Sequence, residues 1–248
     1  SYINEVSMDF VNVNLAEQPV PIRPGMHYQM GGIKTDVHGA TNIPGLYAAG
    51  ECACVSVHGG NRLGANSLLD TVIFGRRAGE ASGEFARGRP TPKIPEAITS
   101  TDKENIREIL DREFGNESTA GLRLIMGQTM NEHLAVFRDE QGMQTALETI
   151  RKLKERYLKV GVQDKGKVYN TALIFALELG FMLDCVETIC IGGLARKESR
   201  GAHFRTDMPA RDDINFLKHT LVSQSINGPE VSFSPVTITQ WQPEERKY

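Results

Sequence analysis

The chain has 248 residues and a formal net charge of −3, from 28 Lys and Arg residues against 31 Asp and Glu residues. Hydrophobic residues make up 40% of the chain, which suffices for a sizeable core in one or two domains. Because the charges are mixed and no long run carries a single sign, the composition disfavours a nucleic-acid-binding protein.

The predicted elements of the first 88 residues are short apolar runs separated by glycine and proline, as is typical of α/β proteins. Residues 45–49, GLYAA, predict a short strand. Residues 66–86 predict a helix, with Asn66 or Ser67 as the N-cap. We therefore expect residues 1–88 to form part of an α/β domain.

The middle of the chain predicts a helical bundle. Residues 88–100 contain three prolines and no apolar period, so they predict a linker. A capping box from Thr101 to Glu104 predicts the start of the next helix. Apolar stripes predict further helices over residues 122–137 and 143–157. With the apolar helix expected over residues 170–190, these helices predict an antiparallel bundle.

The apolar stretch at residues 170–195 is not predicted to cross a membrane. It contains Glu178, Asp184 and Glu187, and each acidic side chain costs about 2.5 to 3.5 kcal/mol at the centre of a bilayer. We expect a buried helix and no direct membrane span.

The last part of the chain changes character again. Residues 196–213 are dense in charge, and residues 231–241, VSFSPVTITQW, alternate like an edge strand. The predicted organisation is therefore an α/β region at 1–88, an antiparallel helical bundle at 89–195 and a mixed tail region at 196–248.

Four cysteines, Cys52, Cys54, Cys185 and Cys190, form a C-x-C and a C-x4-C pair far apart in the sequence. No histidine pair with the spacing of a zinc site lies beside them. We expect no metal site and four reduced, buried thiols in a reducing compartment.

Residues 58–70, HGGNRLGANSLLD, place polar side chains and three glycines at the start of the predicted helix. The first N–H groups of a helix lack intrahelical partners, and the helix dipole favours negative charge there. Gly64 and Ala65 allow a ligand close to the backbone, and Arg62 offers a planar fork for a carboxylate. This pattern predicts a site for an anionic or dipolar ligand, with a surface ion pair as the alternative for Arg62.

Two further residues are candidates for the same site. Glu51 follows the predicted strand at 45–49, where a carboxylate can accept hydrogen bonds from ligand hydroxyls, as in nucleotide sites of α/β proteins; the alternative is an ordinary turn glutamate. His27 precedes the pair Gly31 and Gly32; a lone histidine is more often structural, but the neighbouring motifs favour a binding role.

Three motifs in this order, HYQMGGI, TNIPGLYAAGECACVSVHGGNRLGANSLLDTVIFGR and ESRGAHFRTDMPARDD, resemble the flavoprotein subunit of succinate dehydrogenase and fumarate reductase. The resemblance extends over nearly the whole chain. It implies that residues 1–88 are the carboxyl-terminal part of an FAD-binding domain. It also implies bound FAD and hydride transfer between succinate or fumarate and flavin N5, with electrons passed to an iron–sulfur subunit.

The resemblance also assigns roles to single residues. His27 and Arg62 match the residues that bind the substrate carboxylates in this family. Glu51 matches the acid that holds the FAD ribityl chain, and Asn66, Ser67 and Leu68 match the segment whose backbone reaches the flavin ring. The GxGxxG fingerprint, the histidine linked to flavin, and the capping domain with the proton-donating arginine all precede residue 1 in the family order. The resemblance therefore implies no catalytic residue in this chain and no activity of the piece alone.

The resemblance implies succinate or fumarate as substrate and an assembly with membrane-anchor subunits, which would place the protein in the cytoplasm, peripheral on the inner face of the membrane. Two alternatives stay open: an L-aspartate oxidase on the same FAD scaffold, and a non-catalytic module whose bundle binds a partner. Arg200, His203 and Arg205 have two possible roles, either reaching the flavin site or a partner, or fixing the tail through ion pairs.

Overall fold

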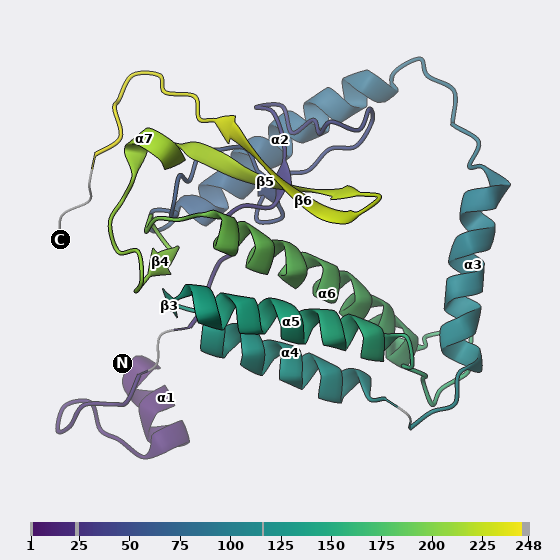
Figure 1. Cartoon of the computed structure of the whole chain (residues 1–248), viewed down its shortest axis with the longest axis horizontal. Coiled ribbons are helices and arrows are strands. Elements are labelled where there is room, and N and C mark those ends of the chain that lie inside the picture. Colours follow the sequence, from purple (N-terminus) through teal and green to yellow (C-terminus); the bar gives the residue numbers. More distant parts are fainter. Residues whose placement is uncertain (1, 23–24, 116, 245–248) are drawn as a thin grey trace.

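A computed structural model describes residues 2–22, 25–115 and 117–244 (Figure 1). Its first elements are α1 (Tyr2–Val11), β1 (Ile33–Lys34), β2 (Ala53–Cys54) and α2 (Asn66–Ala86). The helical part contains α3 (Glu96–Asp111), α4 (Thr119–His133), β3 (Phe137–Arg138), α5 (Glu140–Tyr157) and α6 (Thr171–Ala195). The tail contains β4 (Phe204–Arg205), α7 (Asp213–Phe216), β5 (Lys218–Ser225) and β6 (Gly228–Pro235).

The predicted helical bundle is present and a mixed tail follows it, whereas the region before the bundle contains the helix α2 and only two-residue strands. Among the described residues, no helix is both long and apolar enough to span a bilayer. The boundaries of the three regions, 1–88, 89–195 and 196–248, remain our proposal for the domain organisation.

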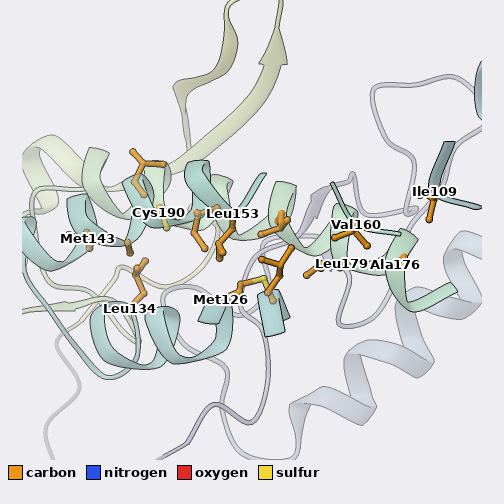
Figure 2. Close-up of a cluster of buried hydrophobic side chains, with 14 of the residues drawn as sticks. Ile109, Met126, Leu134, Met143, Leu153, Val160, Ala176, Leu179 and Cys190 are labelled. Atoms are coloured by element: carbon orange, nitrogen blue, oxygen red, sulfur yellow. The ribbon is translucent and has the colours of Figure 1, made fainter. Parts of the chain in front are cut away.

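Helices α4, α5 and α6 pack side by side and enclose the main core (Figures 1 and 2). The α5 helix shows why: Asp139 caps it by accepting a hydrogen bond from Gly142 N at 2.7 Å, and basic side chains follow in its last turn. Its predicted apolar stripe is fully buried at Met143, Ala146 and Ile150.

The bundle differs from the prediction at two helices. Helix α3 starts at Glu96 instead of Thr101, and the Thr101 hydroxyl donates to Ala97 O at 3.0 Å inside this helix, so the capping box was wrong. Helix α3 stands across the end of the other three, contacts α6 and adds Ile109 to the core (Figure 1). The stripe predicted to reach Phe137 ends earlier, because α4 stops at His133.

The first region is built around α2, which spans the predicted residues 66–86. Strand β1 pairs with β2 in a short parallel ladder, and the predicted strand at 45–49 is reduced to one antiparallel bridge between Ala40 and Tyr47. The connecting segment lies against α2, and a Cβ at Gly39 would lie 2.5 Å from the Cβ of Ala78. Most of this region is therefore loop held on one helix.

The tail returns to both earlier regions. Strands β5 and β6 form an antiparallel hairpin that packs on α6 (Figure 1). The Ser56 hydroxyl and His219 Nε2 lie 2.9 Å apart, which joins the hairpin to the loop after β2. The edge strand predicted over residues 231–241 is confirmed only as far as Pro235.

Candidate functional site

Residues 58–65 form a loop that leads into α2, and Asp70 lies near the start of that helix. The segment around Tyr28 lies against both. The Tyr28 hydroxyl donates to Asp70 Oδ2 at 3.3 Å, and His58 Nε2 lies 3.0 Å from the same oxygen. The rings of Tyr28 and His58 meet edge to face, with centroids 6.1 Å apart. Two stretches separated by some 30 residues in sequence thus share one polar cluster.

Arg62 lies over this cluster. The Cζ atom of its guanidinium is 4.6 Å from the centre of the Tyr28 ring, within the range of a cation–π interaction. Its NH1 group donates to Leu63 O at 2.9 Å, whereas Nε is buried and has no hydrogen-bond partner among the described residues. A buried N–H without a partner is uncommon in folded proteins, and a bound ligand is one of the explanations for it.

Asp70 is the buried acid of the cluster, with 5% of its surface exposed. Its ion-pair partner within the described parts of the chain is His58. Burial raises the pKa of Tyr28, and the neighbouring Asp70 carboxylate acts in the same direction. The Tyr28 hydroxyl therefore stays protonated and keeps donating its hydrogen bond to Asp70 at neutral pH.

Glu51 joins the segment after Tyr28 to the turn before β2. Its Oε1 atom accepts a hydrogen bond from Gln29 N at 2.9 Å. The residue lies in a turn and is exposed. Since the predicted strand before it is only a bridge, Glu51 does not follow the end of a regular strand, but it does lie beside the segment that contains His27.

His27 is exposed and is the neighbour of Tyr28, whose ring contacts Arg62. The structure therefore brings the His27 segment and the Arg62 loop together, although 34 residues separate them in sequence. The expected convergence of their side-chain tips on one ligand stays a prediction.

The start of α2 differs from the predicted cap. The N-cap residue is Ala65, with a φ of 63° in the left-handed region, and no side chain caps the helix there. Asn66 and Ser67 are the first helical residues instead. The Asn66 N–H donates to Leu63 O at 3.3 Å, and no side chain caps the helix start that follows. The start of an uncapped helix favours negative charge, and Ala65 and Gly64 leave the backbone accessible there.

The tail also contacts the loop that contains Arg62, at Gly60. The backbone N–H of Ala202 donates to Gly60 O at 3.0 Å. A Cβ at Gly201 would overlap the Gly60 carbonyl, so only glycine fits at this contact without a shift of the backbone. The charged tail motif at residues 196–213 thus packs against the loop that contains Arg62.

Arg200 and Arg205 are engaged in ion pairs within the tail and with α5. Arg200 Nε donates to the fully buried Glu198 at 2.7 Å, and its NH2 group donates to Asp213 at 2.6 Å. Arg205 is itself fully buried and donates to Asp207 and to Glu140 of α5. These contacts support the structural role, in which the arginines fix the tail.

The His203 side chain also makes structural contacts, through both of its ring nitrogens. Its Nδ1 atom lies 3.1 Å from Arg138 NH1, and its Nε2 atom lies 3.3 Å from Arg196 O. Burial, together with the positive charge of Arg138, lowers the pKa of His203 to about 4. The ring is therefore neutral at pH 7, with Nε2 as donor and Nδ1 as acceptor.

The four cysteines are free thiols, but the expectation that all are buried was wrong. Cys190 is buried in the bundle, whereas Cys52 and Cys185 are exposed and Cys54 is partly covered. Burial raises the pKa of Cys190 to about 11, which keeps this thiol protonated and inert.

The roles of Tyr28, His58 and Asp70 were not predicted from the sequence. One signal was present: Asp70 lies on the same face of the predicted helix as Phe74 and Ala78, where an acid needs a polar partner. The identity of that partner depends on a contact across 42 residues, which no local pattern gives.

The site region combines a guanidinium whose buried Nε has no hydrogen-bond partner among the described residues, an exposed imidazole on the neighbouring Tyr28 segment and a helix start without a side-chain cap. His58, Asn66 and Asp70 line one hollow together with apolar side chains of α2. Such a set is suited to bind a carboxylate at Arg62 and an electron-rich ring edge at the helix start.

Comparison with known proteins defines the class and then the family. Residues 1–68 match the model of an FAD binding domain, so the chain is of the FAD-binding flavoprotein class. Residues 123–248 match the model described as fumarate reductase flavoprotein C-term. The chain belongs to the fumarate reductase and succinate dehydrogenase flavoprotein family.

Individual relatives agree with this assignment. The chain is 43% identical to the fumarate reductase flavoprotein subunit of Mycobacterium tuberculosis over 100% of its own length and 44% of the relative. It is 39% identical to the succinate dehydrogenase flavoprotein subunit of Rickettsia bellii, over 96% of this chain and 42% of that one. A variant Escherichia coli quinol fumarate reductase superposes with a TM-score of 0.92 at 38% identity, covering 99% of this chain and 43% of the other. The chain thus spans less than half the length of these relatives.

Proposed function

We propose that this chain is the carboxyl-terminal portion of a flavoprotein subunit that interconverts succinate and fumarate. The observation that carries the proposal is the Arg62 guanidinium: it lies over the Tyr28 ring, and its buried Nε has no hydrogen-bond partner in the described parts of the chain. The family relationship supports a four-carbon dicarboxylate as the ligand.

His27 and Arg62 are assigned to the two ends of the substrate. A bidentate pair between a guanidinium and a carboxylate fixes both position and angle, which an exposed imidazole nearby complements by donating one hydrogen bond. Together these residues hold the substrate in one orientation. The proton donor for the reaction is expected in the portion of the subunit that precedes this chain in the family order.

Glu51, Asn66, Ser67 and Leu68 are assigned to FAD. The start of α2, which no side chain caps, fits the electron-rich edge of a flavin, since the helix dipole favours negative charge there. Bound FAD supplies the hydride acceptor or donor at N5. Glu51 has carboxylate oxygens that can accept hydrogen bonds from the ribityl hydroxyls, and its bond to Gln29 N holds it beside the substrate segment.

The subunit is further proposed to pass electrons to an iron–sulfur subunit and to sit on the cytoplasmic face of the membrane through membrane-anchor subunits. Solved relatives include a structure described as quinol fumarate reductase with menaquinol molecules, which supports a membrane-associated respiratory assembly. The bundle is assigned a structural role, because its apolar stripes are accounted for by its own core.

The experiment uses the full-length subunit with FAD bound. We expect reduced dye to be oxidised with fumarate, and oxidised dye to be reduced with succinate. L-Aspartate, tested at the same concentrations, is expected to give no turnover, since an L-aspartate oxidase is the competing assignment. Turnover with L-aspartate and none with succinate or fumarate would overturn the proposal.

A further inference from the structure

Asp70 is the polar group through which two separate segments of the candidate site are tied together. One of its oxygens, Oδ2, is the acceptor for both the Tyr28 hydroxyl and His58 Nε2. Tyr28 directly follows His27, and His58 opens the loop that contains Arg62. The carboxylate thus joins the two segments assigned to the substrate.

The burial of Asp70 makes this contact costly unless both partners stay in place. A carboxylate that is 95% covered loses its hydration, and hydrogen bonds must replace it. Its ion-pair partner in the described parts of the chain is a histidine, with no lysine or arginine within ion-pair distance. The two hydrogen bonds therefore depend on each other, and so do the positions of their donors.

The effect of this contact reaches Arg62 through the Tyr28 ring. The guanidinium lies 4.6 Å from the ring centre, so the tilt and position of the ring set where the guanidinium rests. The Tyr28 ring is in turn fixed by its hydroxyl on Asp70 and by its edge-to-face contact with His58. Asp70 itself makes no hydrogen bond to Arg62.

We propose that Asp70 is a positioning residue: its buried carboxylate holds Tyr28 and His58 so that the Arg62 guanidinium is oriented for a substrate carboxylate. This inference rests on the proposed function of Arg62 and adds the residue that acts through it. It predicts that the effect of losing Asp70 on dicarboxylate affinity passes through Arg62.

The test is a double-mutant cycle in the full-length FAD enzyme, with malonate as the dicarboxylate and the flavin spectrum as the signal. We expect Asp70→Ala to raise the malonate dissociation constant roughly tenfold, because Arg62 loses its fixed orientation. In the Arg62→Ala background, Asp70→Ala should cause no further rise. An additive effect of the two substitutions, or no effect of Asp70→Ala alone, would overturn the inference.

A second variant covers the case in which Asp70→Ala does not fold. Tyr28→Phe keeps the ring under Arg62 and removes only the bond to Asp70, so we expect a roughly threefold rise in the dissociation constant, again absent in the Arg62→Ala background. An unchanged constant in Tyr28→Phe also counts against the inference. Glu187→Gln is the matched control, a buried acid paired in the bundle, and should leave malonate binding unchanged.

The cycle separates this inference from the proposed function. If Arg62→Ala alone leaves malonate binding unchanged, the assignment of Arg62 to the substrate is wrong, and the inference falls with it. If Arg62→Ala weakens binding while Asp70→Ala and Tyr28→Phe do not, the proposed function stands and only the positioning role of Asp70 is lost.

Discussion

The bundle and the region before it contain similar apolar side chains but bury them very differently. Among the described residues, the buried hydrophobic side chains other than Ala78 all lie between Ile109 and Cys190 (Figure 2). On α2, by contrast, Leu68 and Val72 are 75% and 66% exposed. The bundle completes its own core, whereas α2 presents apolar surface together with the polar cluster of the site.

This difference separates what stabilises the chain from what binds ligands. In the bundle, stability comes from area removed from water and from ion pairs such as that of Glu187 with Lys154. In the first region, the buried Arg62 Nε has no hydrogen-bond partner among the described residues, and no side chain caps the start of α2. These are the groups that we assign to substrate and cofactor. Substitutions in the bundle and in the region before it can test this difference.

The largest expected effect is in the core of the bundle. Ile150 is fully buried, and Ile150→Ala should lower the free energy of unfolding by about 2 to 5 kcal/mol, because a cavity replaces packed side chain. Val72→Ala on the exposed face of α2 is the matched control and should change it by less than about 0.5 kcal/mol. Denaturant unfolding of the chain measures both, and equal losses would contradict the contrast between the regions.

The next effect concerns pH and the buried His203. Burial and Arg138 lower its pKa to about 4, whereas an unfolded histidine titrates near ~6.5. The unfolded chain therefore binds an extra proton between these values, so stability falls as pH falls from about 6.5 to about 4, by roughly 2 kcal/mol after allowing for solvent screening.

The His203 effect is measured by the free energy of unfolding across this pH range. His203→Gln, which does not titrate, should lose this part of the pH dependence. An identical pH dependence in both proteins would show that His203 is not held neutral by the fold.

A smaller effect is expected where the tail meets the Arg62 loop. Gly201→Ala places a Cβ against the Gly60 carbonyl and should cost roughly 1 to 2 kcal/mol of stability while also weakening dicarboxylate binding in the full-length enzyme. Gly88→Ala is the control, since Gly88 also has a positive φ but has open space around it. If the two variants bind a dicarboxylate equally well, the tail does not support the loop.

Sequence patterns predicted the elements whose signals are local. The period of apolar residues in α5, the apolar composition of α6 and the extent of α2 over residues 66–86 needed no knowledge of the rest of the chain, although the predicted N-cap of α2 was wrong. The strand at 45–49 and the capping box at Thr101 failed, because a strand needs a partner and a capping hydroxyl can equally bond within a helix.

The candidate site was predictable only in part. Arg62, Glu51 and His27 stand out as polar residues beside glycines, and the family resemblance gave them roles. The contact of Tyr28 with Asp70, and the packing of Gly201 on Gly60, join residues far apart in the chain. Such contacts follow from the fold and not from any local spacing, so they were not predicted.

The central claim is that two parts of the segment 58–70 bind different molecules: Arg62 binds the substrate, and the start of α2 binds the flavin. The most direct measurement is the dissociation constant of a dicarboxylate inhibitor, recorded through the flavin spectrum of full-length Arg62→Ala and Arg62→Lys proteins. We predict that Arg62→Ala weakens binding by roughly 2 to 4 kcal/mol, that Arg62→Lys recovers part of this, and that FAD content stays near normal in both. Loss of flavin from Arg62→Ala, with normal dicarboxylate binding once FAD is restored, would contradict the account.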